Sequence, residues 1–246
     1  MPKFFIRKED IKDNMVRICG QDATHIAKVL RTQVGDTLTL CDGEGCDFLS
    51  AAVSVSKDCV LLKITDSIPC LAEPQISVTL FQGLPKQGKM DYIIEKCTEL
   101  GISRIVPVSA KRSVVKIDDK KSEAKKLERW RKIASESVKQ CARGTIPEIT
   151  DVMTVPQAIE FSKSFDLTVA AYECEDMTSL KSVLSQNSPK TVGIFIGPEG
   201  GLDDSEIALF NLAHIKTVTL GKRILRTETA GHTVLSAIMY EYNEFE

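Results

Sequence analysis

The chain has 246 residues, of which 32 are Lys or Arg and 34 are Asp or Glu, and its formal net charge is −2. Hydrophobic residues make up 43%, which supports a buried core and excludes a disordered chain. No apolar run reaches the roughly 18–20 residues of a membrane span. Residues 1–8 also lack the apolar stretch and cleavage site of a signal peptide. We therefore expect a soluble cytoplasmic protein of one large domain or two modest ones.

Cysteine and histidine are the residues that would reveal a metal site. The eight cysteines include no C-x-x-C pair, and there are only three histidines. Zinc sites need closely spaced thiolates or imidazoles, so the sequence predicts no metal. We expect the cysteines to be reduced and mostly buried.

Charge is unevenly distributed along the chain. Residues 104–144 carry a net charge of +8, whereas residues 1–103 carry −2 and residues 145–246 carry −8. A basic segment between acidic flanks is typical of a surface that binds a polyanion such as RNA. A solvated helix face explains the same charges, so both interpretations stay open.

The first part of the chain has the pattern of a small β-barrel. Asp22 precedes apolar residues at helical spacing and predicts a helix with Asp22 as its cap. Strands are predicted at residues 37–40, 51–56 and 59–65, joined by tight turns. These short strands predict a barrel over residues 1–68. Prolines bound the segment at residues 69–74 (PCLAEP), and we interpret residues 69–75 as a linker.

After the linker, predicted strands alternate with predicted helices. Strands are expected at residues 76–81, 104–108, 166–172, 191–196 and 218–220, and helices at residues 90–100, 127–141 and 228–242. Such alternation predicts an α/β domain over residues 76–246, with a mostly parallel sheet covered on both faces.

Open α/β sheets bind ligands at the carboxyl ends of their strands, and three such ends carry polar or glycine-rich residues. They are Tyr172-Glu173, the loop at residues 197–201 (Gly-Pro-Glu-Gly-Gly) and the loop at residues 220–229. The helix after the second loop would be capped by Asp203, Asp204 or Ser205.

The second and third loops differ in what they indicate. The second is neither G-x-G-x-x-G nor a P-loop, which argues against a dinucleotide or nucleoside triphosphate. Its glycines indicate either close approach to a ligand or a tight structural turn. The third gathers two arginines, a lysine and a glutamate at a strand-to-helix connection. It is either a site or an exposed charged loop.

Together these segments resemble the ribosomal small-subunit RNA (16S rRNA) uridine-N3 methyltransferase family, which belongs to the SPOUT superfamily. The resemblance rests on segments at residues 2–5, 25–31 with 35–36, 86–100, 136–149 (ESVKQCARGTIPEI), 196–206 (IGPEGGLDDSE) and 220–231 (LGKRILRTETAG). The last two are the most specific. One departure is Ala142, where family members often carry glycine, and alanine restricts the backbone there.

The resemblance implies a fold and a cofactor. The fold is a C-terminal SPOUT-type α/β domain with a deep trefoil knot, a feature otherwise nearly absent from proteins, and an N-terminal PUA-like RNA-binding β-barrel. The implied cofactor is S-adenosylmethionine, the assembly is a homodimer, and no metal is needed. The cofactor-binding residues would be Tyr172, Ile196, Gly197, Pro198, Glu199, Gly200, Leu220, Gly221, Arg223, Ile224, Leu225 and Thr229. Glu199 would contact either a ribose hydroxyl or the sulfonium.

The implied reaction is methylation of uracil N3 in one uridine of the decoding region of 16S rRNA, in the small ribosomal subunit. N3 is a poor nucleophile until its proton leaves, so the site needs a proton acceptor and a cation for the developing anion. Arg226 is the expected cation. Glu228 is a candidate base or orienting group, and water is the other candidate acceptor.

The implied partner is RNA, held through its phosphates. The residues expected to contact it are Arg7, Lys28, Arg31, Lys89, Arg112, Arg129, Lys139 and Arg143, with Lys111, Lys116, Lys120, Lys121 and Lys132 as further candidates. Two alternatives remain. One is a non-catalytic RNA-binding protein. The other is a different SPOUT activity, on a ribose 2′-hydroxyl or another base.

Overall fold

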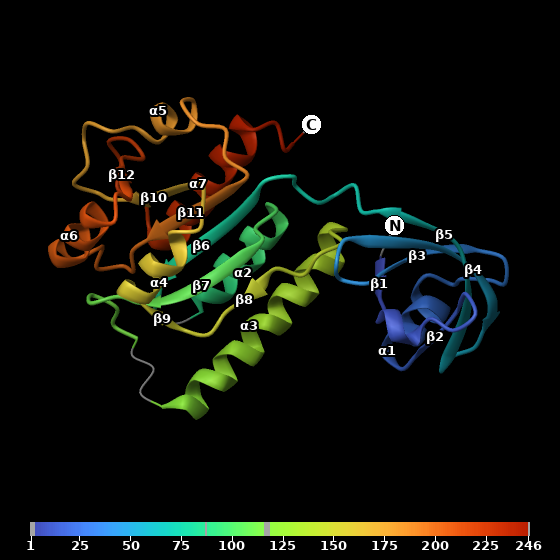
Figure 1. Ribbon diagram of the computed structural model, residues 1–246. Coiled ribbons are helices and arrows are strands. Elements are labelled where there is room, and N and C mark those ends of the chain that lie inside the picture. The colour runs from blue at the N-terminus through green and yellow to red at the C-terminus, as the bar shows by residue number, and fades with distance from the viewer. Residues whose placement is uncertain (1–2, 87, 116–118, 246) are drawn as a thin grey trace. The chain divides into compact units, whose positions relative to one another are not determined.

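The computed structural model describes residues 3–86, 88–115 and 119–245 (Figure 1). The chain divides into two compact units. The first comprises Met1–Glu73 and Val138–Ile146, and the second comprises Pro74–Ser137 and Pro147–Glu246. The first unit thus extends beyond the predicted 1–68 barrel and includes a segment that is distant in sequence.

The carboxylate of Glu73 explains why this distant segment groups with the first unit. Its Oε1 accepts hydrogen bonds from the backbone N–H groups of Gly144 at 2.7 Å and Thr145 at 2.9 Å. Its Oε2 accepts one from Arg143 Nη2 at 2.8 Å. Glu73 lies inside the predicted linker, so part of that segment is a structural element of the first unit.

The first unit is built on a five-stranded sheet. Its strands are β1 (Lys3–Phe5), β2 (Met15–Cys19), β3 (Thr37–Cys41), β4 (Cys46–Val55) and β5 (Cys59–Pro69), in the order β1-β3-β4-β5-β2. β1 runs parallel to β3, and the other pairs are antiparallel. Register shifts at Leu49/Ser50 and Ala52/Ser54 bend β4, so the sheet curls into a half-barrel (Figure 1). The predicted strands in this region are confirmed.

Alternate residues of these strands form the core of the unit. Val16, Leu40 and Leu62 are buried there, as period-two alternation requires. The predicted Asp22 cap is wrong: α1 (Gln21–Thr24) begins after Gly20, whose φ of 75° only glycine adopts readily, and no side chain caps it. α1 continues directly into a π-helical turn, His25–Val29, and a 3-10 turn (Lys8–Asp10) follows β1.

The second unit contains a sheet of seven strands. They are β6 (Ser77–Gly83), β7 (Arg104–Ser109), β8 (Glu148–Ile149), β9 (Met153–Thr154), β10 (Leu167–Ala171), β11 (Thr191–Ile196) and β12 (Lys216–Val218). The order is β12-β10-β11-β6-β7-β8, with β9 also paired to β7, and every pair is parallel. The predicted α/β class and parallel sheet are confirmed.

Helices flank this sheet on both faces. They are α2 (Lys89–Glu99), α3 (Lys120–Cys141), α4 (Val155–Ser162), α5 (Leu180–Leu184), α6 (Asp204–Leu212) and α7 (Thr227–Glu241) (Figure 1). On one face, Phe81 of β6 stacks on Phe195 of β11 with ring centroids 4.3 Å apart, and Phe210 of α6 packs against Phe195. On the other face, α7 passes close to Leu80, where Gly231 leaves room for the approach. Successive side chains of each strand therefore pack against helices on opposite faces of the sheet.

Two helices were not predicted, because both are short. α4 has a capping box between Thr154 and Gln157 and a proline in its first turn, and α5 spans only five residues. In the part of the chain that the structure describes, no helix combines the length and apolar character needed to cross a membrane.

Candidate functional site

Four strands of the second unit end at one edge of the sheet. The register places Ile196 of β11 beside Ala171 of β10 and Gln82 of β6, and Val218 of β12 beside Ala171. The three loops singled out in the sequence therefore lie next to one another. The loop after β6 joins them, although it was not predicted; the same strand-end rule would have found it.

Close backbone contacts define the loop at residues 197–201. A Cβ atom at Gly83 would lie 2.6 Å from the backbone N of Pro198. Gly201 has a φ of 72°, and a Cβ there would overlap the carboxylate of Glu173. Only glycine allows these approaches, so the loop of β11 is held against the ends of both β6 and β10.

Asp203 caps α6 and ties the loop to the end of β7. Its carboxylate accepts a hydrogen bond from Ser205 N–H in a capping box with Glu206. Lys111 Nζ donates to it at 2.8 Å and Arg112 Nε at 3.3 Å. The Lys111 hydrogen bond, with those of Ser205, holds the pKa of Asp203 well below its usual range. Of the three residues expected to cap this helix, Asp203 is the N-cap of α6.

A buried hydrogen-bond chain joins β6, the β11 loop and α7. Gln82 Nε2 donates to Thr227 Oγ1 at 2.8 Å, and Thr227 Oγ1 donates to the backbone oxygen of Gly197 at 2.6 Å. Gln82 is fully buried, and its Oε1 has no hydrogen-bond partner among the described residues. Neither Gln82 nor Thr227 was expected to contribute. Their position at strand and helix ends is the signal that would have found them.

Lys89 lies between two carboxylates. Its Nζ is 3.0 Å from Glu199 Oε1 and 3.0 Å from Glu228 Oε2. Glu199 also accepts hydrogen bonds from the Lys86 N–H at 2.9 and 3.2 Å. Lys89 was predicted to contact RNA phosphate, but here its charge is shared between Glu199 and Glu228. The ion pairs connect the loops after β6 and β11 with the start of α7.

Both carboxylates are stabilised in their charged form. Burial by itself raises the pKa of Glu228, but hydrogen bonds from its own backbone and from Lys89, with the charges of Lys89 and Arg226, lower it overall. The pKa of Glu199 is lowered in the same way, with the Lys86 N–H adding to Lys89 against the burial. Glu228 is therefore an ionised carboxylate whose charge Lys89 helps to stabilise.

The loop after β12 has backbone N–H groups that are available to a ligand. Gly221 has a φ of 97°, and residues 222–225, all within the described range, have no backbone N–H hydrogen bond to the protein. Ile224 is 88% exposed. Leu220 and Leu225 are half-buried, whereas Arg223 and Thr229 are exposed. Such a loop offers donors, acceptors and apolar surface to a flat ligand.

Arg226 stands directly before the first residue of α7. It is exposed and makes no side-chain capping hydrogen bond. Its charge lies close enough to Glu228 to lower that carboxyl's pKa. The structure thus brings together both residues that were expected to be catalytic.

Tyr172 fastens the end of β10 to α6. Its hydroxyl donates to Asp204 Oδ1 at 3.3 Å. Hydrogen bonding with Cys174, with burial and the nearby charge of Asp204, raises the pKa of Tyr172 to about 12. Tyr172 is therefore a neutral group beside the loops. Ile196 and Pro198 are buried under the same edge.

The residues expected to bind RNA fall into different environments. In the first unit, Lys28 and Arg31 are exposed at the π-helical turn, and Arg7 is exposed but ion-paired with Glu9 and Asp10. Arg143 is only 3% exposed and paired with Glu73. Its burial argues against a phosphate contact and gives it a structural role.

In the second unit, Arg129 is exposed and ion-paired with Asp91, and Lys120, Lys121 and Lys132 are exposed on α3. Lys139, near the end of that helix, belongs to the first unit and is half-buried. Arg112 and Lys111 hold Asp203, as described above. Lys116 lies outside the described residues.

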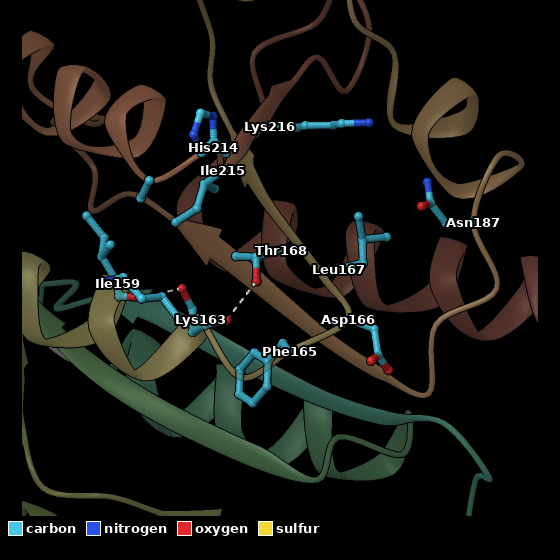
Figure 2. Close-up of a pocket in the computed structure, with 12 residues that line it drawn as sticks. Ile159, Lys163, Phe165, Asp166, Leu167, Thr168, Asn187, His214, Ile215 and Lys216 are labelled. Atoms are coloured by element: carbon cyan, nitrogen blue, oxygen red, sulfur yellow. Dashed lines mark hydrogen bonds between the residues drawn. The ribbon is translucent and has the colours of Figure 1, made fainter.

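A pocket of about 320 Å³ opens at the opposite edge of the sheet (Figure 2). Leu167 and Thr168 at the start of β10 and Lys216 at the start of β12 line it. Asp166 also lines it, but its carboxylate accepts hydrogen bonds from the backbone of Lys190 and Thr191. The pocket is separate from the four loops. Across residues 3–86, 88–115 and 119–245, no three His, Cys, Asp or Glu residues cluster as metal ligands would.

Comparison with known proteins agrees with this architecture. Residues 72–239 match the RNA methyltransferase domain family, and residues 18–64 match the RNA methyltransferase PUA domain family. A Bacillus subtilis protein named ribosomal RNA small subunit methyltransferase E is 39% identical over 98% of this chain and 97% of its own length.

Two solved structures have a similar fold. A Neisseria gonorrhoeae ribosomal RNA small subunit methyltransferase E, bound to S-adenosylmethionine, has a TM-score of 0.82 at 26% identity, with 98% of this chain and 97% of that chain covered. A methyltransferase structure from Legionella pneumophila, in complex with the same cofactor, also has a TM-score of 0.82, at 29% identity, with 97% and 96% covered.

The fold, the strand-end loops and these matches define an RNA methyltransferase with a PUA-like domain. More particularly, the chain belongs to the family of ribosomal RNA small subunit methyltransferase E.

Proposed function

We propose that this protein transfers the methyl group of S-adenosylmethionine to N3 of a uridine in 16S rRNA. The observation that carries the proposal is the meeting of the glycine loop at 197–201, the open loop at 220–226 and the Glu228–Lys89 ion pair at one sheet edge. Relatives of the same fold hold this cofactor. Family membership supports a ribosomal RNA substrate.

The chemistry of the open loop fits the cofactor. Free backbone groups of residues 222–225 would read the polar edges of adenine, and the side chains of Leu220 and Leu225 would cover its face. Gly197 and Gly200 would let the ribose and methionine parts approach the backbone. The bound cofactor supplies an electrophilic methyl group on a sulfonium.

The main role of Glu199 would be to hold two loops of the site in place. Its carboxylate already has Lys86 and Lys89 as partners, and these hold the loops after β6 and β11 together. A ribose hydroxyl of the cofactor would donate an additional hydrogen bond to the Glu199 carboxylate, which would keep its ion pair with Lys89. Its negative charge would also favour a nearby sulfonium.

Arg226 would stabilise the negative charge that develops on uracil, and Glu228 would assist removal of the N3 proton. Loss of the N3 proton spreads negative charge onto the two uracil carbonyl oxygens, and the exposed guanidinium of Arg226 would stabilise it. Glu228, ionised beside Lys89, would accept the proton directly or orient a water that does so. The target base would need to be unstacked to reach this edge.

RNA binding would involve both units. The exposed cations of α3 and those of the π-helical turn would contact phosphates, while Arg143 and Glu73 maintain the first unit. In this proposal the first unit, predicted over residues 1–68, binds RNA, the second unit, predicted over residues 76–246, carries out methyl transfer, and the protein is a homodimer. Sedimentation of the purified protein tests the assembly.

Mass spectrometry of nucleosides tests the proposed function. The protein is incubated with S-adenosylmethionine and with small-subunit RNA, free or assembled, from a strain lacking the corresponding gene. The expected product is N3-methyluridine. A 2′-O-methylated ribose or another methylated base would instead establish a different activity on the same fold. Absence of S-adenosylmethionine binding in calorimetry would favour a non-catalytic RNA-binding protein.

A further inference from the structure

Two cysteines face each other across the edge of the first unit's sheet. Cys19 is the last residue of β2, Cys59 is the first residue of β5, and the antiparallel register pairs them directly. Their sulfur atoms are 3.4 Å apart, with the Cys19 thiol donating to Cys59 Sγ. Neither thiol is buried: Cys19 is exposed and Cys59 is half-buried.

The backbone around the pair is fixed. Ser56 N–H donates to the backbone oxygen of Cys59 at 2.9 Å, and Cys59 N–H donates to Ser56 Oγ at 3.1 Å. Thr24 Oγ1 donates to the oxygens of Gly20 and Lys57, which joins the chain after β2 to the turn before β5. The strand register and these hydrogen bonds therefore fix the backbone positions of the two cysteines opposite each other.

The geometry suits a disulfide. Directly opposed residues of antiparallel strands have Cα atoms about 4.5–5.5 Å apart, which lies within the roughly 4.4–6.8 Å that disulfides span. The sulfurs must approach from 3.4 Å to about 2.05 Å for the bond to form.

The other cysteines lie in different environments, although all eight are free thiols. Cys41, Cys70 and Cys97 are buried, and burial raises the pKa of Cys41 to about 12. The expectation that the cysteines are mostly buried is wrong, because Cys19 and Cys174 are exposed and three more are half-buried. Exposed thiols are accessible to oxidants.

We propose that Cys19 and Cys59 form a site of reversible thiol oxidation by small-molecule disulfides. One thiolate attacks the disulfide and releases one thiol, and the second thiolate then displaces the other. The two cysteines lose two protons and two electrons and gain one S–S bond, while the small disulfide is reduced to two thiols. The product closes a loop of about 40 residues that contains α1, the π-helical turn, β3 and β4.

The disulfide would stabilise the first unit and fix its edge strand. β2 is the last strand on its side of the sheet, and β5 is its only neighbour in the strand order of the described residues. A covalent link at its end limits fraying and constrains the segment that carries Lys28 and Arg31. Oxidation would thereby make the RNA-binding surface of this unit more rigid.

Peptide mapping of the oxidised full-length protein tests the proposal. The native protein is treated with glutathione disulfide, its remaining thiols are alkylated, and it is digested without reductant. The expected result is a linked peptide pair containing Cys19 and Cys59, which dithiothreitol separates. Cys19→Ser and Cys59→Ser should each abolish it, whereas Cys174→Ser, at an exposed cysteine of the second unit, should not.

Thermal unfolding supplies a second readout. Oxidised wild-type protein should unfold at a higher temperature than the reduced protein, by roughly 10 °C for the first unit. The Cys19→Ser protein should show no such rise, and its circular dichroism checks that it is folded. Separate glutathione adducts on Cys19 and Cys59, or no reaction at either while Cys174 reacts, would overturn the proposal.

Discussion

The ammonium group of Lys89 lies 3.0 Å from the carboxylate of Glu228, and the two residues come from different helices, α2 and α7. Glu199, at the same distance from Lys89, completes a bridge across three loops. The bridge keeps both carboxylates charged where the glycine loop and the arginine-rich loop meet. It therefore gives Lys89 a positioning role in the proposed reaction.

Lys89→Ala should reduce methyl transfer about tenfold, which corresponds to about 1.4 kcal/mol in transition-state stabilisation. Without the cation, Glu199 and Glu228 repel each other and the loops separate, so kcat should fall and the KM for the cofactor should rise. Lys89→Arg should restore much of the activity. The matched control is Lys96→Ala on the same helix, whose partners are Glu95 and Glu99. Equal activity of the Lys89→Ala and Lys96→Ala variants would contradict a positioning role for Lys89.

Arg226→Ala should lower kcat by about 100-fold or more, because it removes the cation expected to stabilise the developing uracil anion. Cofactor affinity, measured by calorimetry, should change little. Lys222→Ala in the same loop serves as the control for loss of one exposed positive charge. Near-normal turnover by the Arg226→Ala enzyme would remove Arg226 from the mechanism.

Thr227→Val should destabilise the second unit by about 1–3 kcal/mol and weaken cofactor binding. The substitution keeps the side-chain shape but leaves the oxygen of Gly197 without its hydroxyl donor. It also removes one of the two acceptors of the buried Gln82 amide, whose Nε2 still donates to the oxygen of Gly83 at 3.0 Å. Denaturant unfolding and calorimetry measure the two effects. Thr233→Val, whose hydroxyl donates only to a backbone oxygen of the same exposed helical turn, should cost much less.

Ala142→Gly should stabilise the protein by about 0.5–1 kcal/mol. Ala142 follows the last residue of α3 with a φ of 61°, a left-handed conformation in which a Cβ atom is strained. The substitution places the residue typical of the family at this position. Ala134→Gly in the interior of α3 should have the opposite effect, because Ala134 is buried there. An unfolding midpoint that falls in both variants would show that Ala142 is unstrained.

RNA affinity should fall steeply as salt concentration rises, since phosphate contacts release counterions. Lys121→Ala with Lys132→Ala should lower the slope of log affinity against log salt by about 0.7 per lost contact. Lys163→Ala with Lys190→Ala removes the same charge from other parts of the chain and should leave the slope unchanged. A flat salt dependence in the wild-type protein would instead favour a merely solvated basic face.

Local pattern predicted most of the fold, because strands and helices follow the periodicity of buried residues. β11 was predicted at its observed bounds, and the strand-end rule located the loops around Gly197 and Leu220. The partners of charged side chains were not predictable in this way. Glu73 and Arg143, or Lys89 and Glu228, are far apart in sequence, and only the folded chain brings them together. The trefoil knot stays a prediction from the resemblance.

The parallel pairing of β6 with β11 has a consequence for how the chain folds. These central strands align Ser77 with Thr191, and the ribosome therefore synthesises β6 long before β11. Parallel strands that are distant in sequence pair slowly, because the long intervening loop must close first. Until Ile196 has left the ribosome, the apolar faces of β6 and β7 have no completed sheet to join. Nascent chains that stop before this point should therefore aggregate or be degraded, and those that extend beyond α7 should fold.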